Sequence, residues 1–125
     1  MADTAWIYEV VAAIAAHDGE RAAAFFAEDG RFEAVSVGLR VSGRSAIADM
    51  LGPGSDGFSK DDQLEVESVV SDGEVFAVQW HSRGTRNSDG EKYDYRGASV
   101  GRLRDGLVTT WTDYFDPAPM GLKAD

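Results

Sequence analysis

Short turn signals divide the C-terminal half of the chain and constrain its fold more than any other feature. Asp-Gly pairs stand at residues 72–73, 89–90 and 105–106, and a serine precedes each of the first two. The segments between them are rich in β-branched and aromatic residues, a pattern typical of strands joined by tight hairpin turns. The pattern predicts four successive antiparallel strands at residues 64–71, 75–86, 93–104 and 107–115.

The N-terminal half favours helices. Residues 4–17 repeat apolar side chains at i, i+3, i+4 and i+7, which is the spacing of one buried helical stripe. Further helices are expected at residues 20–27 and 44–51, and short strands at residues 31–37 and 38–41. Helices that precede an antiparallel meander predict an α+β domain, with the helices packed on one face of a curved sheet.

Composition narrows the possible functions. The chain has 125 residues, which fits one domain over residues 1–125, and it contains no cysteine, which excludes disulfides and thiolate chemistry. Its net charge of −10 disfavours nucleic acid and anionic membrane surfaces as partners. We find no apolar run of membrane-spanning length, no basic segment of a signal peptide in residues 1–8, and no metal-ligand spacing. We therefore expect a cytoplasmic protein without a structural metal.

Strand alternation predicts which side chains face the helices. In the strand at 75–86 the apolar row contains Trp80 and Ser82, with His81 on the opposite face. In the strand at 107–115, Val108 falls outside, and the inner row is Leu107, Thr109, Trp111, Asp113 and Phe115. In the strand at 93–104 the inner row is Tyr95, Gly97, Ser99, Gly101 and Leu103. The missing volume at the two glycines predicts a cavity; alternatively, the glycines permit sheet bending or close helix contacts.

Asp113 is the main candidate for a catalytic residue. It falls between Trp111 and Phe115 on the predicted inner face, where desolvation raises the pKa of a carboxyl group unless a donor pairs with it. A carboxyl group that titrates closer to neutrality can act as a general acid or base. The alternative is a buried structural aspartate that accepts hydrogen bonds from a Tyr, a Trp or the backbone.

Several other residues are candidates for catalytic or substrate-binding roles beside Asp113. Tyr95 could donate a hydrogen bond to a substrate oxygen or to Asp113, and His81 could serve as an acid or base if a β-bulge turned it inward. Residues 52–63 form a long loop that acts either as a lid carrying Phe58 or as a mobile surface loop. The side chains expected to line a substrate site are Trp80, Ser82, Trp111, Phe115, Phe32 and Phe58. For the aromatic members, an ordinary core is the alternative.

Three stretches resemble a known group of proteins. Residues 105–116, DGLVTTWTDYFD, resemble the closing strand of SnoaL-like and limonene-epoxide-hydrolase-like proteins. Residues 25–29, FFAED, resemble the stretch before the first strand in that superfamily, and residues 41–47 are similar to the start of its third helix. The superfamily includes ketosteroid isomerases and nuclear transport factor two, and the order of elements agrees over nearly the whole chain.

The resemblance implies a cone-shaped α+β barrel of the nuclear transport factor two-like type. A curved antiparallel or mixed sheet would wrap around the N-terminal helices over a deep apolar pocket, and the outer face of the sheet would form a homodimer. The ligand implied is a small apolar or polycyclic molecule, with no cofactor. The activity implied is acid/base catalysis by Asp113, of the SnoaL-like cyclase, isomerase or dehydratase type.

Other activities of the superfamily transfer less well. The arginine and second aspartate of the epoxide hydrolases would fall at Trp80 and Ser82, and the ketosteroid isomerase base would fall near Ala34. Epoxide hydrolysis is therefore the less favoured enzyme activity. A non-catalytic ligand-binding or dimerisation module of the same fold is the alternative to an enzyme.

Overall fold

The computed structural model describes residues 3–118, so the outermost parts of the predicted domain, residues 1–2 and 119–125, lie outside the described residues. The helices are α1 (Ala5–Ala15), α2 (Gly19–Ala23) and α3 (Arg44–Leu51), with short 3-10 turns at Val35–Val37 and Pro53–Ser55. The strands are β1 (Phe26–Ala34), β2 (Leu39–Ser42), β3 (Gln63–Ser71), β4 (Val75–Thr85), β5 (Lys92–Arg104) and β6 (Leu107–Phe115). No helix in the described range is long and apolar enough to cross a membrane.

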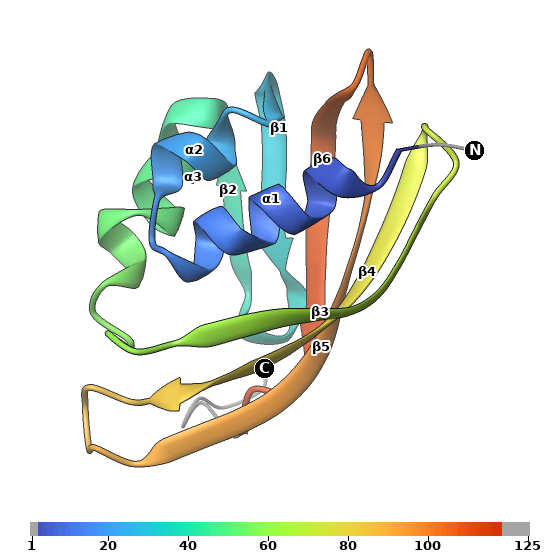
Figure 1. Ribbon diagram of the computed structural model, residues 1–125. Coiled ribbons are helices and arrows are strands. Elements are labelled where there is room, and N and C mark those ends of the chain that lie inside the picture. The colour runs from blue at the N-terminus through green and yellow to red at the C-terminus, as the bar shows by residue number, and fades with distance from the viewer. Residues whose placement is uncertain (1–2, 119–125) are drawn as a thin grey trace.

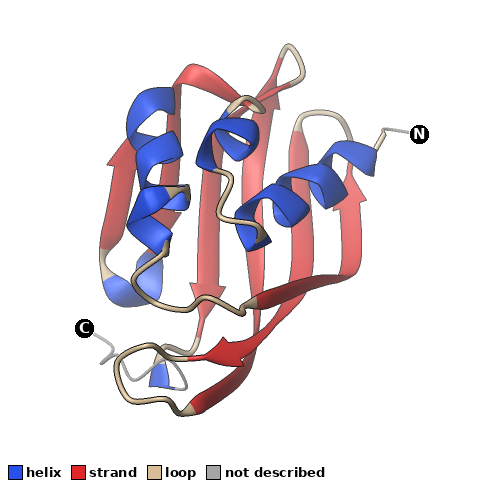
Figure 2. Ribbon diagram, turned by 60° about the vertical axis from the view of Figure 1, so that its left-hand side comes forward, coloured by secondary structure: helices blue, strands red, loops and turns tan. Residues whose placement is uncertain are grey.

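All six strands belong to one curved sheet. Their order is β2-β1-β6-β5-β4-β3, and β1 runs parallel to β6 while the other neighbours are antiparallel. The helices cover one face of this sheet, with α1 lying across the strands (Figures 1 and 2). The α+β class, the mixed sheet and the helix-covered face that we predicted are thus confirmed.

The core lies between α1 and the inner face of the sheet. Ile7 and Val10 of α1 are fully buried, as the apolar stripe predicted, and they belong to one cluster with Phe76 and Trp111. The ring of Trp6 packs edge-on against Phe76, with centroids 5.1 Å apart. Burial of such large apolar side chains is the main favourable contribution to folding, and it fixes the sheet that carries the candidate site.

The predicted turns form as their residues require. Asp72 Oδ1 accepts hydrogen bonds from the backbone N–H groups of Glu74 and Val75, both at 2.8 Å. Asp105 and Gly106 both have left-handed φ angles, of 54° and 79°, which is the geometry of a type I′ turn. The turn at Asp72 joins β3 to β4, and the turn at Asp105 and Gly106 joins β5 to β6.

The bounds of α2 and β1 differ most from the prediction. The strand expected at residues 31–37 ends at Ala34, and Val35–Val37 form a 3-10 turn. The helix expected at residues 20–27 ends at Ala23, and β1 begins at Phe26 rather than at residue 31. Phe26 is fully buried and pairs with Val108 of β6, so tertiary pairing outweighs the helical propensity of the alanine run. Gly30, which looked like a break between elements, lies inside β1 where a Cβ would come within 3.0 Å of a carbonyl oxygen of β6.

A bulge also changes the alternation in β6. The register with β5 shifts between the pairs Leu103–Val108 and Arg102–Thr110, so one extra residue is inserted at Thr109. The bulge turns Val108 inward, where it is fully buried. The predicted outer position of Val108 is therefore wrong. Alternation resumes beyond the bulge, which keeps Trp111 and Asp113 on the predicted face.

Candidate active site

Asp113 lies on the inner face of β6, between two strands that position it. Ser99 of β5 is its direct antiparallel partner, and Ala34 of β1 is its parallel partner on the other side. Ser99 Oγ donates a hydrogen bond to Asp113 Oδ1 at 2.5 Å, and Trp111 Nε1 donates to the same oxygen at 2.8 Å. Both donors are therefore held by the sheet itself, Trp111 two residues along the strand and Ser99 directly across it.

The electrostatic state of Asp113 follows from this environment. Burial raises the pKa of Asp113 to about 6, while the hydrogen bonds from Ser99 and Trp111 favour the carboxylate and act in the opposite direction. Within residues 3–118, Oδ2 accepts no hydrogen bond, and the side chain keeps part of its surface accessible. One carboxylate oxygen is thus anchored, and the other has no hydrogen-bond donor among the described residues.

A further hydrogen bond, from Trp80, supports the contact between Ser99 and Asp113. Trp80 Nε1 of β4 donates a hydrogen bond to Ser99 Oγ at 2.9 Å, and Ser99 is fully buried. The hydroxyl therefore accepts from one indole while it donates to the carboxylate, which fixes the direction of its O–H bond. Three adjacent strands contribute to a single hydrogen-bonded chain that ends on Asp113.

Strand alternation predicts that Ser99 lies on the inner face but does not indicate a role for it. A signal was available, because Ser99 is the only hydroxyl in the inner row between Gly97 and Gly101. Only the strand register, which places Ser99 directly beside Asp113, converts that signal into a contact.

Removing the Ser99 hydroxyl should raise the pKa of Asp113 above about 6. In Ser99→Ala the carboxylate loses one of its two donors, and the buried indole N–H of Trp80 loses its acceptor, at a cost of about 1–3 kcal/mol. Titration of the Asp113 carboxyl carbon by NMR measures the first effect, and urea unfolding measures the second. Ser82→Ala, which removes another inner-face hydroxyl, should leave the pKa of Asp113 unchanged. Equal pKa values in the Ser99 variant and the wild type would contradict this contact.

The predicted void at the glycines is filled. A Cβ at Gly97 would lie 2.4 Å from the ring of Trp80, and a Cβ at Gly101 would lie 2.6 Å from the ring of Phe76. Neighbouring aromatic rings therefore occupy the space that we interpreted as a cavity. The alternative, that the glycines permit close contacts, holds here with rings of the adjacent strand in place of helices.

Aromatic side chains gather near Asp113 on the inner face of the sheet. Trp80, Tyr95 and Phe115 form a triangle with ring centroids 5.6 to 6.0 Å apart, and Phe32 stacks on Trp111 at 6.3 Å. Tyr95 and Phe115 keep some accessible surface on the inner face. Five of the predicted site residues, together with Asp113, thus gather in one region.

Tyr95 keeps its phenolic proton near neutral pH and can donate it in a hydrogen bond. Burial raises the pKa of Tyr95 to about 12, although a hydrogen bond with Ser82 acts in the opposite direction. Ser82 is buried and is the direct cross-strand partner of Tyr95. The phenol therefore stays neutral and is suited to orient an oxygen atom.

The structure does not bring His81 to Asp113. The register of β4 with β5 continues without a shift from Val75 to Thr85, so the bulge that would turn His81 inward is not there. His81 lies on the outer face, where its Nε2 is 2.5 Å from Asp94 Oδ1. An acid/base role for His81 beside Asp113 is therefore not supported by its position.

Phe58 contacts the site through an intermediate ring. Its centroid lies 5.1 Å from that of Tyr93, and Tyr93 in turn lies 5.9 Å from Tyr95. The loop that carries Phe58 is attached to the β4–β5 hairpin, since the backbone N–H of Asn87 donates to the carbonyl of Phe58 at 2.9 Å. Of the two interpretations of this loop, a fastened cover fits better than a free surface segment.

The groups that contact Asp113 also bear on epoxide hydrolysis. Within residues 3–118, neither a guanidinium nor a second carboxylate forms a hydrogen bond or ion pair with Asp113. The aspartate–arginine–aspartate arrangement of the epoxide hydrolases is thus not reproduced by rearranged partners in this range. In the same range, no group of three His, Asp or Glu side chains is arranged to hold a metal ion.

Most of the chain matches a known protein family. Residues 7–111 match the model of the SnoaL-like domain. The chain belongs to the SnoaL-like family. No curated protein matches the sequence.

Solved structures resemble this SnoaL-like chain over most of its length. A protein of ketosteroid isomerase-like fold from Catenulispora acidiphila, in complex with trimethylamine, is 19% identical with a TM-score of 0.86, covering 99% of this chain and 98% of that chain. A candidate polyketide cyclase from Xanthomonas campestris is 24% identical with a TM-score of 0.77, covering 90% and 88%. A candidate ketosteroid isomerase from Kribbella flavida is 25% identical with a TM-score of 0.70, covering 90% and 76%. These similarities confirm the nuclear transport factor two-like fold.

Proposed function

We propose that this SnoaL-like protein is a small cofactor-independent enzyme that moves a proton on an apolar, oxygenated metabolite. Asp113 is the acid/base group, and Tyr95 orients a substrate oxygen. The observation that carries the proposal is a carboxyl group with a pKa of about 6, anchored through Oδ1 and without a hydrogen bond at Oδ2 from residues 3–118. Such a group exchanges protons readily near neutral pH.

The proposed step is a proton transfer at carbon next to a carbonyl group. Asp113 Oδ2 removes the proton, the electron pair of the C–H bond moves into an enolate, and the phenol of Tyr95 donates a hydrogen bond to the enolate oxygen. The carboxyl group then returns the proton to the same or another atom. Cyclisation, isomerisation and dehydration all share such a step. Trp80, Trp111 and Phe115 exclude water around the carboxyl group.

Hydrogen exchange of a simple ketone tests this step without knowledge of the natural substrate. In D₂O, the protein should accelerate deuterium uptake beside the carbonyl of β-tetralone, an apolar bicyclic ketone, as followed by NMR. The rate should rise as the pH passes through about 6, because the carboxylate is the basic form. General-base catalysis contributes about 10²- to 10⁴-fold, so Asp113→Asn should lose that factor. Asp94→Asn on the outer face is the control, and an unchanged rate in the Asp113 variant would refute the role of Asp113.

A second candidate function is a non-catalytic ligand-binding or dimerisation module. It is favoured by the exposed apolar side chains on the outer face of the sheet, among them Val100 and Tyr114, which are 38% and 51% exposed. The trimethylamine complex of the Catenulispora acidiphila protein supports a small-molecule site in either case. Ligand binding without turnover, insensitive to Asp113→Asn, would favour this second function.

We also propose a homodimer, formed through the outer face of the sheet in the cytoplasm. Tyr114→Lys places a charge on this outer face and should shift the protein to a monomer of 13.5 kDa. Sedimentation velocity measures the change, and a wild-type protein that sediments as a monomer would contradict the proposal.

A further inference from the structure

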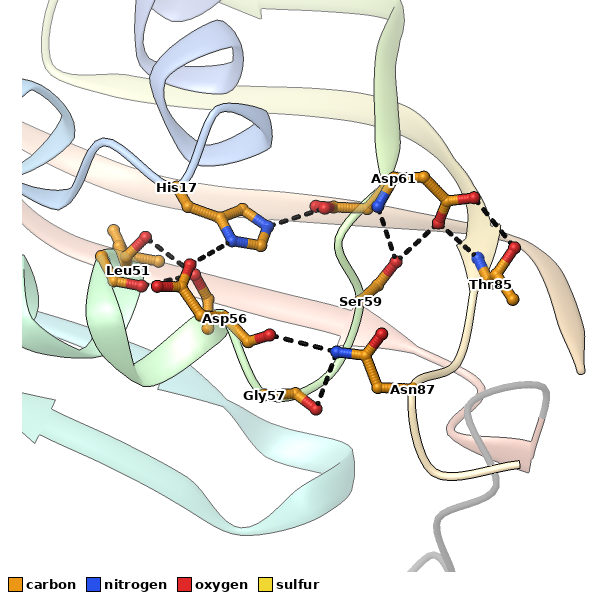
Figure 3. Close-up of polar contacts among 11 residues, drawn as sticks. His17, Leu51, Asp56, Gly57, Ser59, Asp61, Thr85 and Asn87 are labelled. Carbon is orange, nitrogen blue, oxygen red and sulfur yellow. Dashed lines mark hydrogen bonds and ion pairs between the residues drawn. The ribbon is translucent and has the colours of Figure 1, made fainter. Parts of the chain in front are cut away.

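The imidazole of His17 lies between two carboxylates of one loop. This loop, residues 52–62, connects α3 to β3 and is called the 52–62 loop below. His17 Nδ1 is 2.6 Å from Asp56 Oδ1 (Figure 3), and His17 Nε2 is 2.6 Å from Asp62 Oδ1. A neutral imidazole has one N–H and can donate to only one of them, whereas the imidazolium has two. The geometry is thus that of a protonated histidine.

The backbone of His17 supports a dedicated role for its side chain. His17 follows α1 at a position with a left-handed φ of 57°, where the backbone N–H of His17 bonds to Ile14 and that of Asp18 bonds to Ala13. This is a Schellman motif, whose left-handed residue is usually glycine. A histidine there is strained, and such outliers persist where the surrounding contacts hold them.

The opposite side of the 52–62 loop is attached to the β4–β5 hairpin. Asp61 accepts hydrogen bonds from the backbone N–H and the hydroxyl of Thr85, at 2.8 and 2.9 Å. The side-chain amide of Asn87 donates to the carbonyls of Asp56 and Gly57 (Figure 3). The loop therefore bridges from the end of α1 to the hairpin, and it presses Phe58 against Tyr93.

The charged groups near His17 are mostly acidic. A groove between α2 and α3 includes His17. Its other charged lining residues are Asp18, Glu20, Glu28, Asp49 and Arg44, and the guanidinium of Arg44 donates to the carbonyl of Phe26. On the loop side, Asp56 and Asp62 contact the ring directly. Partial burial acts to lower the pKa of His17, but its hydrogen bonds and charge interactions with Asp56 and Asp62 outweigh this and raise the pKa above 6.5.

We propose that protonated His17 is a latch that holds the 52–62 loop closed, and that loss of the proton releases the α1 side of the loop. When His17 is neutral, one carboxylate faces a nitrogen lone pair instead of an N–H. That contact becomes repulsive, and the loop then stays attached mainly through the contacts of Asp61 with Thr85. The contacts of Asn87 with Asp56, Gly57 and Phe58 open together with the α1 side. Movement of the loop would displace Phe58 from Tyr93 and so open the aromatic region toward Asp113. This last consequence rests on the proposed function, whereas the latch itself does not.

The direction of the pH effect follows from linkage. The closed loop binds the proton of His17 more tightly than the open loop, in which the pKa of His17 returns to about 6.5. The latch is therefore complete below about pH 6.5 and weakens as the pH rises through the higher pKa of the closed state. The opening equilibrium should increase tenfold for each unit by which the closed-state pKa exceeds 6.5.

Two independent measurements test the latch on the intact protein. NMR titration of the ring gives the pKa of His17, and the sequence holds only one other histidine, His81. The backbone N–H of Asn87 donates to the carbonyl of Phe58. Hydrogen exchange at this N–H gives the opening equilibrium of the loop after correction for intrinsic exchange rates. The fold-change in opening between pH 6 and pH 9 should equal the fold-change that the measured pKa predicts. No substrate is needed, so a failed latch and a failed proposed function are distinguishable.

Substitutions of His17 distinguish the role of its side chain in the latch from the role of its backbone at the end of α1. Glycine and asparagine both accept the left-handed backbone, so His17→Gly and His17→Asn should fold, with an open loop whose exchange no longer depends on pH beyond the intrinsic rate. His81→Asn is the control and should keep the pH dependence. The proposal is overturned if His17 titrates at or below 6.5, or if the wild type and His17→Asn show the same dependence of opening on pH.

Discussion

The Asp113→Asn variant is expected to be more stable than the wild-type protein at pH 7 by up to about 3 kcal/mol. Burial raises the pKa of Asp113 from 3.8 to about 6 in the folded state, so the folded protein favours the protonated carboxyl. The stability that this preference contributes is complete below about pH 4 and is lost as the pH rises through about 6. At about 1.4 kcal/mol per pKa unit, the loss at neutral pH is about 3 kcal/mol. Asparagine stays neutral, and its carbonyl oxygen can accept both hydrogen bonds.

Urea unfolding at several pH values measures this effect. The difference in unfolding free energy between Asp113→Asn and the wild type should be near zero at low pH and should grow between pH 4 and pH 7. Asp94→Asn is a matched control of opposite sign, because the hydrogen bond with His81 holds the pKa of Asp94 below its usual range. A less stable Asp113→Asn at pH 7 would mean that the protein stabilises the carboxylate, which would remove the physical basis of its raised pKa.

The Gly101→Ala variant is expected to lose about 3 kcal/mol of stability or to fail to fold. A Cβ at this position would lie 2.0 Å from the carbonyl oxygen of Thr110 and 2.6 Å from the ring of Phe76. The first neighbour is backbone of the adjacent strand β6, so relief requires β5 and β6 to separate. Overpacking in a well-packed interior costs about 1–3 kcal/mol, and a clash with rigid backbone falls at the upper end.

Gly57→Ala provides the comparison for this clash. A Cβ at Gly57 meets nothing within 4 Å, and Gly57 is not among the residues with positive φ. Its replacement should change the unfolding free energy by less than about 1 kcal/mol, with a small gain from the reduced freedom of the unfolded chain. Chemical denaturation of both variants checks the pair, and equal stabilities would show that β5 and β6 adjust easily at Gly101.

Local sequence signals predicted most of the strand framework. Asp-Gly turns and alternation gave the four C-terminal strands within about two residues, because turn chemistry and side-chain period act over short distances. The inner position of Asp113 followed from the same alternation. Helix α3 was predicted with its observed bounds, Arg44–Leu51.

Contacts between distant segments could not be predicted in this way. The end of α2 depends on the pairing of Phe26 with Val108, and the bulge at Thr109 depends on the shifted register between β5 and β6. The two donors to Asp113 also depend on register, since Ser99 lies on another strand. The space beside Gly97 and Gly101 could not be predicted from the sequence for the same reason. The rings of Trp80 and Phe76, from another strand, fill this space.

The parallel pairing of β1 with β6 has a consequence for synthesis of the chain. β1 is made early, yet its neighbour β6 is made after the other five strands of the sheet. Until then, the long edge of β1 that will bond to β6 stays bare, and bare edges invite association with other chains. β6 also carries Asp113, so this carboxyl group enters its buried environment in the same event that completes the sheet. Nascent protein should therefore gain its protease resistance and the raised pKa of Asp113 together, rather than one after the other.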